Sequence, residues 1–444
     1  MSYNRFSVAI VLFTICIAFS FNIVRTTLAN PDSSTGIVEP TVLWNFTLPT
    51  YEVTYFVGHS SYSYNSSQRF TSPAVANGIV YVGSDGGAQF GNDQGLYAFD
   101  ALTGSILWKF NYTYRAYDCP TVVDGVVYAG SWNGPVYALN AETGRQLWEY
   151  GTHFLIEESP AVADGVVYAG SGDGNVYALK AANGEKLWNF TVGRSEYYPW
   201  YYTFTTPAVA NNMVYLGSQD HNVYALSTVN GEKVWNFETG DAVYAAPKVS
   251  NGVVYIGSYD GNVYALNAIN GHEIWHFTTT PNSEGYSFID ATPVIANGVL
   301  YIGSENDILF ALNIVDGSEV WRFTTGSDIS SSATILNGVI YFGSEDHNIY
   351  ALNATTGNKL WNYTTDDSIR SSPAISNGVL YVGTYAGSIY ALGTPSTNPV
   401  PAPDIPTIPE SSQLVFAVSA IAVGGVVVVA IAMKRKRQKR TQVS

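Results

Sequence analysis

The sequence predicts an all-β fold, an eight-bladed β-propeller of four-stranded antiparallel blades. A phrase of about 40 residues recurs along the chain, as expected for a propeller. Its Tyr-x-Gly centre recurs at Tyr81, Tyr128, Tyr168, Tyr215, Tyr255, Tyr301, Tyr341 and Tyr381. The last copy ends near Leu392 without the Trp that closes the others, whereas Leu43-Trp44-Asn45-Phe46 stands alone ahead of the first copy. We therefore expect a ring over residues 41–393, in which the N-terminal strand completes the last blade.

Each copy contains four strand signals separated by turn residues. In the copy around Tyr168 the expected strands are residues 160–163, 166–170, 176–179 and 186–190. They are rich in β-branched and aromatic residues. Asp164-Gly165 and Asn183-Gly184 supply the Asp/Asn-Gly pairs that favour tight hairpins. Because one blade cannot bury both of its apolar faces, neighbouring blades must stack.

A Trp near the end of each copy is expected to dock between adjacent blades, which would bury roughly 150–250 Å² per side chain. These blade-docking residues are Trp44, Trp108, Trp148, Trp188, Trp235, Trp275, Trp321 and Trp361. A direct role in ligand binding is the alternative for the same side chains.

Both ends carry targeting signals. Residues 1–29 contain Arg5, an apolar run and a small-residue exit, which indicates a signal peptide or an uncleaved anchor. Residues 413–433 are uncharged and long enough to span a bilayer as a helix, and residues 434–444 form a basic tail. Residues 394–412 contain six prolines and should form an extended stalk. These signals predict a single-pass protein of the cell membrane, with the propeller outside and the C-terminus in the cytoplasm.

The charge distribution supports an exported propeller and excludes nucleic acid as a partner. Eight of the 20 basic residues lie in the two terminal segments, so 12 basic residues face 35 acidic ones elsewhere. Nucleic-acid binding needs a basic surface. The two cysteines are Cys16, in the N-terminal apolar run, and Cys119. A cysteine metal cluster and a disulfide within the propeller are therefore excluded.

Irregular insertions between blades indicate the binding face, because loops inserted on one face of a repeat fold often carry function. Residues 48–70, 191–205 and 278–291 depart most from the repeat and are rich in aromatic side chains. The candidate residues for binding a ligand or partner are Tyr197, Tyr198, Trp200, Tyr201, Tyr202, Tyr286 and Phe288. The alternative is that these aromatic side chains only cover the blades.

The residues that enter the innermost strands should line the channel mouth. The candidates are Arg69, Asp118, Glu157, Glu158, Asp290 and Arg370. Mixed charge there would bind a cation or a polar ligand, or would simply form a solvated funnel. In the first copy Asp85, Asn92 and Asp93 offer oxygen ligands for calcium, but they lack the spacing of a known calcium loop. We therefore assign no metal site and no catalytic residue.

FDALTGSILW at 99–108 and LNAETGRQLW at 139–148 resemble the tryptophan-docking repeat of quinoprotein dehydrogenases. The resemblance extends over residues 43–392. It implies a pyrroloquinoline-quinone (PQQ)-type eight-bladed propeller, a family that includes cofactor-free members such as the propeller lipoprotein of the bacterial outer-membrane assembly machinery. The enzymes of the family use an adjacent cysteine pair and a calcium held by Glu, Asn and Asp. The chain has no such pair, and those calcium ligands cannot be matched to its positions.

The sequence thus favours a membrane-anchored, cofactor-free propeller that serves as a binding or scaffold module for an extracellular protein or carbohydrate. A PQQ- and calcium-dependent dehydrogenase is one alternative. A structural component of the cell surface or an adhesion component is the other.

Overall fold

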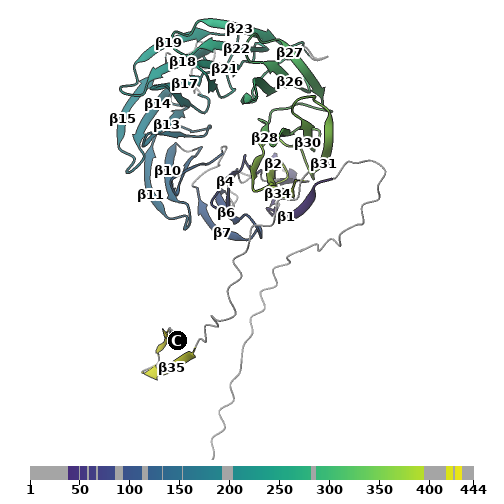
Figure 1. Cartoon of the computed structure of the whole chain (residues 1–444). Helices are drawn as coiled ribbons and strands as arrows, with labels where there is room; N and C mark the ends of the chain where they lie inside the picture. Colours follow the sequence, from purple (N-terminus) through teal and green to yellow (C-terminus); the bar gives the residue numbers. More distant parts are fainter. Residues whose placement is uncertain are drawn as a thin grey trace, which may run out of the picture. The chain divides into compact units, whose positions relative to one another are not determined.

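The computed structural model contains eight four-stranded antiparallel sheets arranged as blades of a ring (Figure 1). It describes residues 39–49, 51–57, 60–66, 69–85, 94–112, 119–132, 134–152, 154–192, 204–281, 287–394, 417–423 and 426–432. For residues 51–57, 60–66, 417–423 and 426–432 only the backbone is described. The predicted all-β eight-bladed propeller is confirmed.

The strands of each blade follow one another from the centre of the ring outward. Blade 1 is β4 (Ala74–Ala76), β5 (Ile79–Ser84), β6 (Gly95–Asp100) and β7 (Ile106–Asn111); blade 2 is β8 (Thr121–Val123), β9 (Val126–Gly130), β10 (Pro135–Asn140) and β11 (Gln146–Gly151). Blade 3 is β12 (Ala161–Ala163), β13 (Val166–Ser171), β14 (Asn175–Lys180) and β15 (Lys186–Thr191); blade 4 is β16 (Ala208–Ala210), β17 (Met213–Gly217), β18 (Asn222–Ser227) and β19 (Lys233–Glu238). Blade 5 is β20 (Lys248–Ser250), β21 (Val253–Gly257), β22 (Asn262–Asn267) and β23 (Glu273–Thr278); blade 6 is β24 (Val294–Ala296), β25 (Val299–Gly303), β26 (Ile308–Asn313) and β27 (Glu319–Thr324). Blade 7 is β28 (Thr334–Leu336), β29 (Val339–Gly343), β30 (Asn348–Asn353) and β31 (Lys359–Thr364); blade 8 is β32 (Ala374–Ser376), β33 (Val379–Gly383), β34 (Ser388–Gly393) and the N-terminal β1 (Thr41–Thr47).

The ring is closed by β1, which pairs antiparallel with β34 as the sequence predicts. The register runs from Thr41 opposite Gly393 to Thr47 opposite Ser388. The Oγ1 of Thr47 and the Oγ of Ser388 lie 2.7 Å apart and share a hydrogen bond. Blade 8 therefore joins two segments from opposite ends of the propeller sequence.

Adjacent blades are joined by a Trp, a Tyr and a Gly from the repeat. The Nε1 of Trp108 and the hydroxyl of Tyr81 both donate to the carbonyl oxygen of Ala141 in the next blade, at 2.9 Å and 3.1 Å. The Trp108 ring covers Gly144, whose φ is +67° and where an added Cβ would lie 2.6 Å from the ring. The equivalent Trp and Tyr of five other blades also donate to a shared carbonyl oxygen in the next blade. These acceptors are Ala101, Ala181, Ala268, Ile314 and Ala354.

The core lies between blades rather than within them. One cluster combines Tyr215, Val223 and Trp235 of blade 4 with Val254 and Leu266 of blade 5. Each of these side chains is less than one tenth exposed. The stacking of neighbours thus buries the apolar faces that a single blade would leave in water.

The ring has two faces, which we call the turn face and the loop face. On the turn face, the turn between the first two strands of a blade lies beside the turn between the last two; Ala181 N, for example, donates to Gly165 O at 2.9 Å. Asp164 (φ 50°) and Gly165 (φ 73°) adopt the left-handed values of a type I′ hairpin. On the loop face, the connections between blades lie beside the turns between second and third strands, and Gly172 N donates to Leu155 O at 2.8 Å.

Two further hairpins are described by their backbones. One consists of β2 (Tyr51–Val57) and β3 (Ser60–Ser66) and follows β1 in the chain. The other consists of β35 (Ala417–Val423) and β36 (Val426–Ala432), in a separate unit that covers residues 396–444. Among the described residues, no helix has the length and apolar character needed to cross a bilayer.

The predicted membrane helix over 413–433 coincides with β35 and β36, so the described residues there form strands. The membrane-spanning helix stays a prediction. The predicted signal peptide at 1–29 and basic tail at 434–444 lie outside the described residues, as does the predicted stalk apart from Thr394.

Candidate functional site at the channel mouth

One position of the repeat lies on the loop face and carries side chains of different chemical types in different blades. It follows the Gly-Ser or Gly-Thr pair at the end of the second strand. Its residues, here called the mouth ring, are Asp85, Trp132, Gly172, Gln219, Tyr259, Glu305, Glu345 and Tyr385.

The glycine two residues before the mouth-ring position is constrained by packing. At Gly343 an added Cβ would lie 2.2 Å from Ile369 in the loop that enters blade 8, so a larger residue does not fit. Two residues later, Glu345 N donates to Asp328 O at 2.9 Å, which holds the backbone of the mouth-ring position. The backbone is thus held in place although the residue at this position differs from blade to blade.

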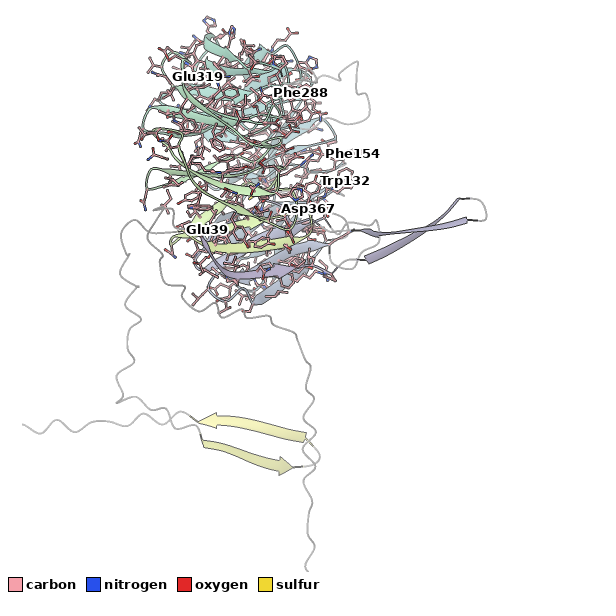
Figure 2. All side chains as sticks on the ribbon, turned by 90° about the vertical axis from the view of Figure 1, so that its right-hand side faces the viewer. Glu39, Trp132, Phe154, Phe288, Glu319 and Asp367 are labelled. Carbon is pink, nitrogen blue, oxygen red and sulfur yellow. The ribbon has the colours of Figure 1, made fainter. Side chains whose placement is uncertain are left out.

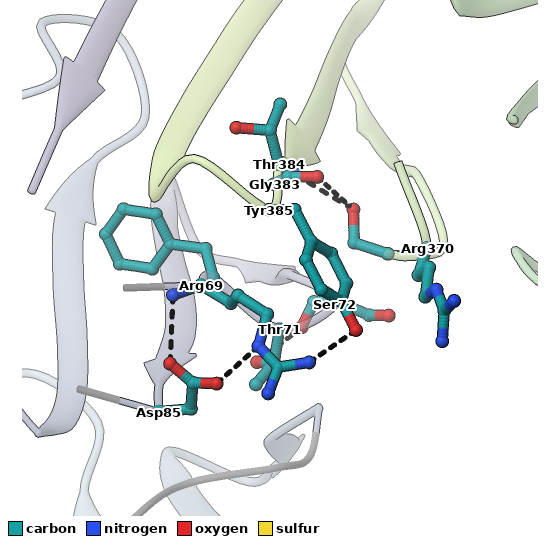
Figure 3. A pocket seen from close by; sticks show the side chains of 10 residues that line it. Arg69, Thr71, Ser72, Asp85, Arg370, Gly383, Thr384 and Tyr385 are labelled. Carbon is teal, nitrogen blue, oxygen red and sulfur yellow. Dashed lines mark hydrogen bonds and ion pairs between the residues drawn. The ribbon is translucent and has the colours of Figure 1, made fainter. Parts of the chain in front are cut away.

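A first sector of the mouth stacks a tyrosine with two arginines (Figure 3). The guanidinium carbon of Arg69 lies 4.5 Å from the ring centre of Tyr385, and that of Arg370 lies 5.3 Å from it. Arg69 Nε pairs with Asp85 Oδ2 at 2.5 Å, and Arg370 Nε pairs with Glu345 Oε1 at 2.7 Å. Arg69, Asp85, Arg370 and Tyr385 line a cavity of about 180 Å³. The sector offers cation–π surface with balanced charge.

A second sector holds buried carboxyl groups. Burial is the main reason that the pKa of Asp290 is raised well above its usual value, and the negative charge of the nearby Glu305 raises it further. The Oδ1 of Asp290 is buried and has no hydrogen-bond partner. Burial and the charge of Glu345 raise the pKa of Asp328 to about 6.

Across the ring, blade 3 contributes two more carboxyl groups of this kind. Burial raises the pKa of Glu157 to about 7. Burial and the neighbouring Glu157 raise the pKa of Glu158 to about 8, and Thr206 Oγ1 donates to Glu158 Oε2 at 3.3 Å. Near neutral pH the mouth therefore carries less negative charge than its composition suggests, and it offers carboxyl groups that can both donate and accept hydrogen bonds.

A third sector is aromatic. The rings of Tyr244 and Tyr259 lie 4.4 Å apart, and Tyr259 stacks on Phe288 at 4.5 Å with an interplanar angle of 14°. In blades 2 and 3, Trp132 and Phe154 are 38% and 41% exposed. Figure 2 shows Trp132, Phe154 and Phe288 along the same side of the ring. Large aromatic side chains that remain this exposed are typical of binding surfaces.

The structure brings Arg69 and Arg370 together at Tyr385 and Asp290 near Arg370, whereas Glu157 and Glu158 lie together in the loop that enters blade 3. Arg69, Glu157, Glu158, Asp290 and Arg370 all belong to the loops that enter the inner strands. Asp118 lies outside the described residues, as do the predicted binding residues Tyr197, Tyr198, Trp200, Tyr201, Tyr202 and Tyr286. Phe288 is described and lies in the aromatic sector. The binding roles stay predictions.

Several mouth residues were missed by the sequence-based reasoning, which searched for irregular loops. Trp132, Tyr259, Glu305, Glu345 and Tyr385 occupy a regular repeat position. An alignment of the eight copies would reveal this position, because it combines acids, an amide, aromatics and a glycine beside constant neighbours.

The family model described as "Outer membrane protein assembly factor BamB" matches residues 37–198, 202–291 and 284–400. The chain therefore belongs to this PQQ-like propeller family. No curated protein was found to match the sequence.

Solved structures agree with this fold. BamB from Moraxella catarrhalis has 16% identity and a TM-score of 0.62, with 80% of this chain and 100% of that chain covered. The quinohemoprotein alcohol dehydrogenase from Comamonas testosteroni has 16% identity and a TM-score of 0.61, with 86% and 79% covered. The computationally designed Ika8 protein has 18% identity and a TM-score of 0.62, with 73% and 96% covered. At these identities the likeness concerns the fold.

The described mouth residues do not fit PQQ, a planar quinone with three carboxylates. Both mouth arginines already pair with carboxylates of the protein, Arg69 with Asp85 and Arg370 with Glu345, so their charges are already balanced. Cys119 has no adjacent cysteine in the sequence. Among the described residues, no group of three or more His, Cys, Asp or Glu side chains could hold a metal ion. We assign no metal site to Asp85, although the sequence offers it as an oxygen ligand for calcium; its two carboxylate oxygens accept from Arg69 N and Nε.

Proposed function

We propose that this protein is a membrane-anchored, extracytoplasmic scaffold that binds a protein partner through the loop face around the channel mouth. The observation that carries the proposal is the pair of exposed aromatic side chains, Trp132 and Phe154. Ile156 N donates to Ser131 O, and Thr152 N donates to Gly134 O, each at 3.1 Å. These bonds hold the Trp132 turn against the Phe154 loop, so both side chains project from one rigid surface.

The chemistry of the mouth supports a protein partner. Aromatic residues and arginine are enriched in the energetic centres of protein interfaces. The mouth combines Trp132 and Phe154 with Arg370, which is exposed although it pairs with Glu345. The family model is named after an assembly factor, a protein that acts on other proteins. We propose that the function needs no cofactor.

Both ends of the propeller sequence leave from the turn face. Thr394 N donates to Gly378 O, in the turn between the first two strands of blade 8. Thr41 pairs with Gly393 at the same edge. The predicted stalk therefore begins on the turn face, opposite the proposed binding surface. We propose that the propeller lies outside and the basic tail in the cytoplasm.

A site-specific crosslinking experiment tests the proposal. A photoreactive amino acid is placed at Trp132 in one variant and, as a matched control, at Leu102 in another; Leu102 is 84% exposed on the turn face. We expect a discrete crosslinked protein in membranes from the first variant. That product should disappear when Phe154→Ala is added. Crosslinking from Leu102 alone would show that the loop face is not the interface.

The proposed topology is tested separately by protease treatment of intact cells. We expect the propeller to be digested, while an epitope at the C-terminus remains protected until the membrane is opened. Protection of the propeller in intact cells would contradict the outward orientation.

A further inference from the structure

Below the mouth, the channel is lined by a second repeated position that we call the hydroxyl ring. It stands immediately before the proline, or Ala333, that precedes each inner strand. Six of its eight residues carry hydroxyl groups: Ser72, Ser159, Thr206, Thr292, Ser332 and Ser372. Cys119 and Ala246 are the two exceptions.

Hydrogen bonds between blades orient part of this ring. Thr292 N donates to Ser332 Oγ at 2.9 Å, Ser332 N to Ser372 Oγ at 2.9 Å, and Ser372 N to Ser72 Oγ at 2.8 Å. In each bond the hydroxyl oxygen accepts, so its own proton remains available for donation. Within the described part of the chain, the hydroxyls of Ser72, Ser332 and Ser372 have no acceptor. The ring therefore presents hydrogen-bond donors to the channel.

A single cation stands in the gap of this ring. Lys248 is the one charged residue on the eight inner strands β4, β8, β12, β16, β20, β24, β28 and β32. It is exposed, and it makes no ion pair with any described residue. Two residues before Lys248, the smaller Ala246 replaces the hydroxyl residue found in the neighbouring blades. Blade 5 therefore lacks a hydroxyl group at this position and carries a positive charge two residues later.

Lys248 and four residues of the hydroxyl ring surround one cavity, and of the donors Ser72, Ser332 and Ser372 it is Ser332 that lies in its lining. Its volume is about 490 Å³, and its lining includes Ser159, Thr206, Lys248, Thr292 and Ser332. That volume suits a small ligand. Each inner strand pairs with one neighbour only, so its other edge adds backbone groups to the channel wall. The cavity therefore combines a cation with many neutral hydrogen-bonding groups.

We infer that the channel binds a small hydroxylated anion, such as a hydroxycarboxylate or a sugar phosphate. The ammonium group of Lys248 pairs with the anionic group, and the hydroxyl ring binds the hydroxyl groups of the ligand. A charge-assisted bond inside a channel is stronger than a neutral one, so Lys248 contributes most to affinity. This inference is independent of the proposed partner on the loop face.

Glu158 is an acidic residue in contact with the cavity lining, because Thr206 Oγ1 donates to its Oε2 at 3.3 Å, and it permits such a ligand. Glu158 directly precedes Ser159, and burial raises the pKa of Glu158 to about 8. Its carboxyl group is therefore mostly neutral at pH 6, and repulsion of an anion is small under that condition.

Calorimetric titration of the full-length protein in detergent at pH 6 and low salt tests the inference. The probes are citrate and glycerol 3-phosphate. Two partial probes serve as controls: inorganic phosphate lacks the hydroxylated carbon skeleton, and glycerol lacks the charge. We expect saturable binding of citrate, glycerol 3-phosphate or both, and weaker binding of the two partial probes. Lys248→Met should weaken binding roughly tenfold or more, as expected when a charge-assisted bond is lost.

Matched variants make the outcome decisive. Lys186→Met removes an exposed lysine from the outer strand β15 and should leave binding unchanged. Ser332→Ala should weaken binding by a smaller factor than Lys248→Met. The inference is overturned if neither citrate nor glycerol 3-phosphate binds the parent protein, or if Lys248→Met binds as the parent does. Equal affinity for inorganic phosphate and glycerol 3-phosphate would remove the role of the hydroxyl ring.

Discussion

The turn face and the loop face are made by the same eight repeats, but they differ in how far their residues vary. On the turn face, seven glycines adopt φ values near +70°, and an added Cβ at each would lie 2.5 to 2.7 Å from the Trp of the preceding blade. On the loop face, the mouth ring changes from Asp85 to Trp132 to Gly172 in consecutive blades. Packing between blades thus restricts the turn face to the same glycine in seven blades. The mouth-ring position carries different residues in different blades, although Gly172 is also packed closely against Phe154 and Leu155.

The stability of the propeller depends on contacts that recur in the blades. It should therefore be most sensitive to changes in the Trp, Tyr and Gly contacts between blades, which lie near the turn face. Binding and pH dependence should instead follow the mouth. The following experiments test that division, in order of decreasing expected effect.

The largest effect should come from opening the ring. Deleting residues 30–47 removes β1, exposes β34 as an edge strand, and removes the bond from Trp44 Nε1 to Ala101 O. Exposed edges promote aggregation. We expect loss of the single cooperative unfolding transition in scanning calorimetry, with increased light scattering. If the truncated protein melted like the parent, closure by β1 would contribute little.

Removal of one blade-docking Trp should have the next largest effect. Trp235→Ala should lower the free energy of unfolding by about 3–5 kcal/mol, because it empties a buried aromatic site. Trp132→Ala on the loop face should cost less, since Trp132 is 38% exposed whereas Trp235 is 8% exposed. Urea denaturation of both variants measures the difference, and equal losses would contradict the division between the two faces.

A pair of glycine substitutions separates packing from backbone strain. Gly271 and Gly252 have φ values of +72° and +78°, so alanine should cost about 1–2 kcal/mol at either position. At Gly271 the new Cβ would also lie 2.6 Å from the Trp235 ring, whereas nothing lies within 4 Å at Gly252. We expect Gly271→Ala to be less stable than Gly252→Ala by about 1–3 kcal/mol in chemical denaturation. Equal stabilities would show that the Trp does not require glycine.

The smallest effect concerns the pH dependence of the mouth. The pKa of Glu157 is raised to about 7 and that of Glu158 to about 8, so the folded state holds these protons more tightly than the unfolded state. Their contribution to stability is complete below pH 4 and is lost as the pH rises through about 7 and 8. The variant with Glu157→Gln and Glu158→Gln should therefore be more stable than the parent at pH 8.5 by roughly 1–2 kcal/mol, a value reduced for partial solvation. Parallel stability profiles from pH 4 to 8.5 would indicate ordinary surface carboxylates.

Much of the fold could be predicted from the sequence because the information is local and repeated. In the copy around Tyr168, the expected strands agree with β12 to β15 within one residue at each end. The turns follow from Asp164-Gly165 and its equivalents, which need left-handed backbone angles. The closure of the ring by the N-terminal strand could also be predicted, because the last copy lacks a segment that stands before the first copy.

The mouth could be predicted only in outline. The sequence located the loops of Arg69, Asp290 and Arg370, but it did not show what each side chain contacts. Arg69 and Tyr385 are separated by 316 positions and meet only because the ring closes. The raised pKa of Asp290 depends on Glu305, which belongs to a different turn.

The sequence by itself determined the blade, the number of blades and the way in which the ring closes, since these follow from short-range patterns repeated eight times. Only the tertiary structure decided which side chains meet around the channel. Those contacts join loops from different blades, and the curvature of the closed ring sets their distances. No pattern along the chain specifies that Tyr385 lies between two arginines or that Lys248 stands in a gap of the hydroxyl ring.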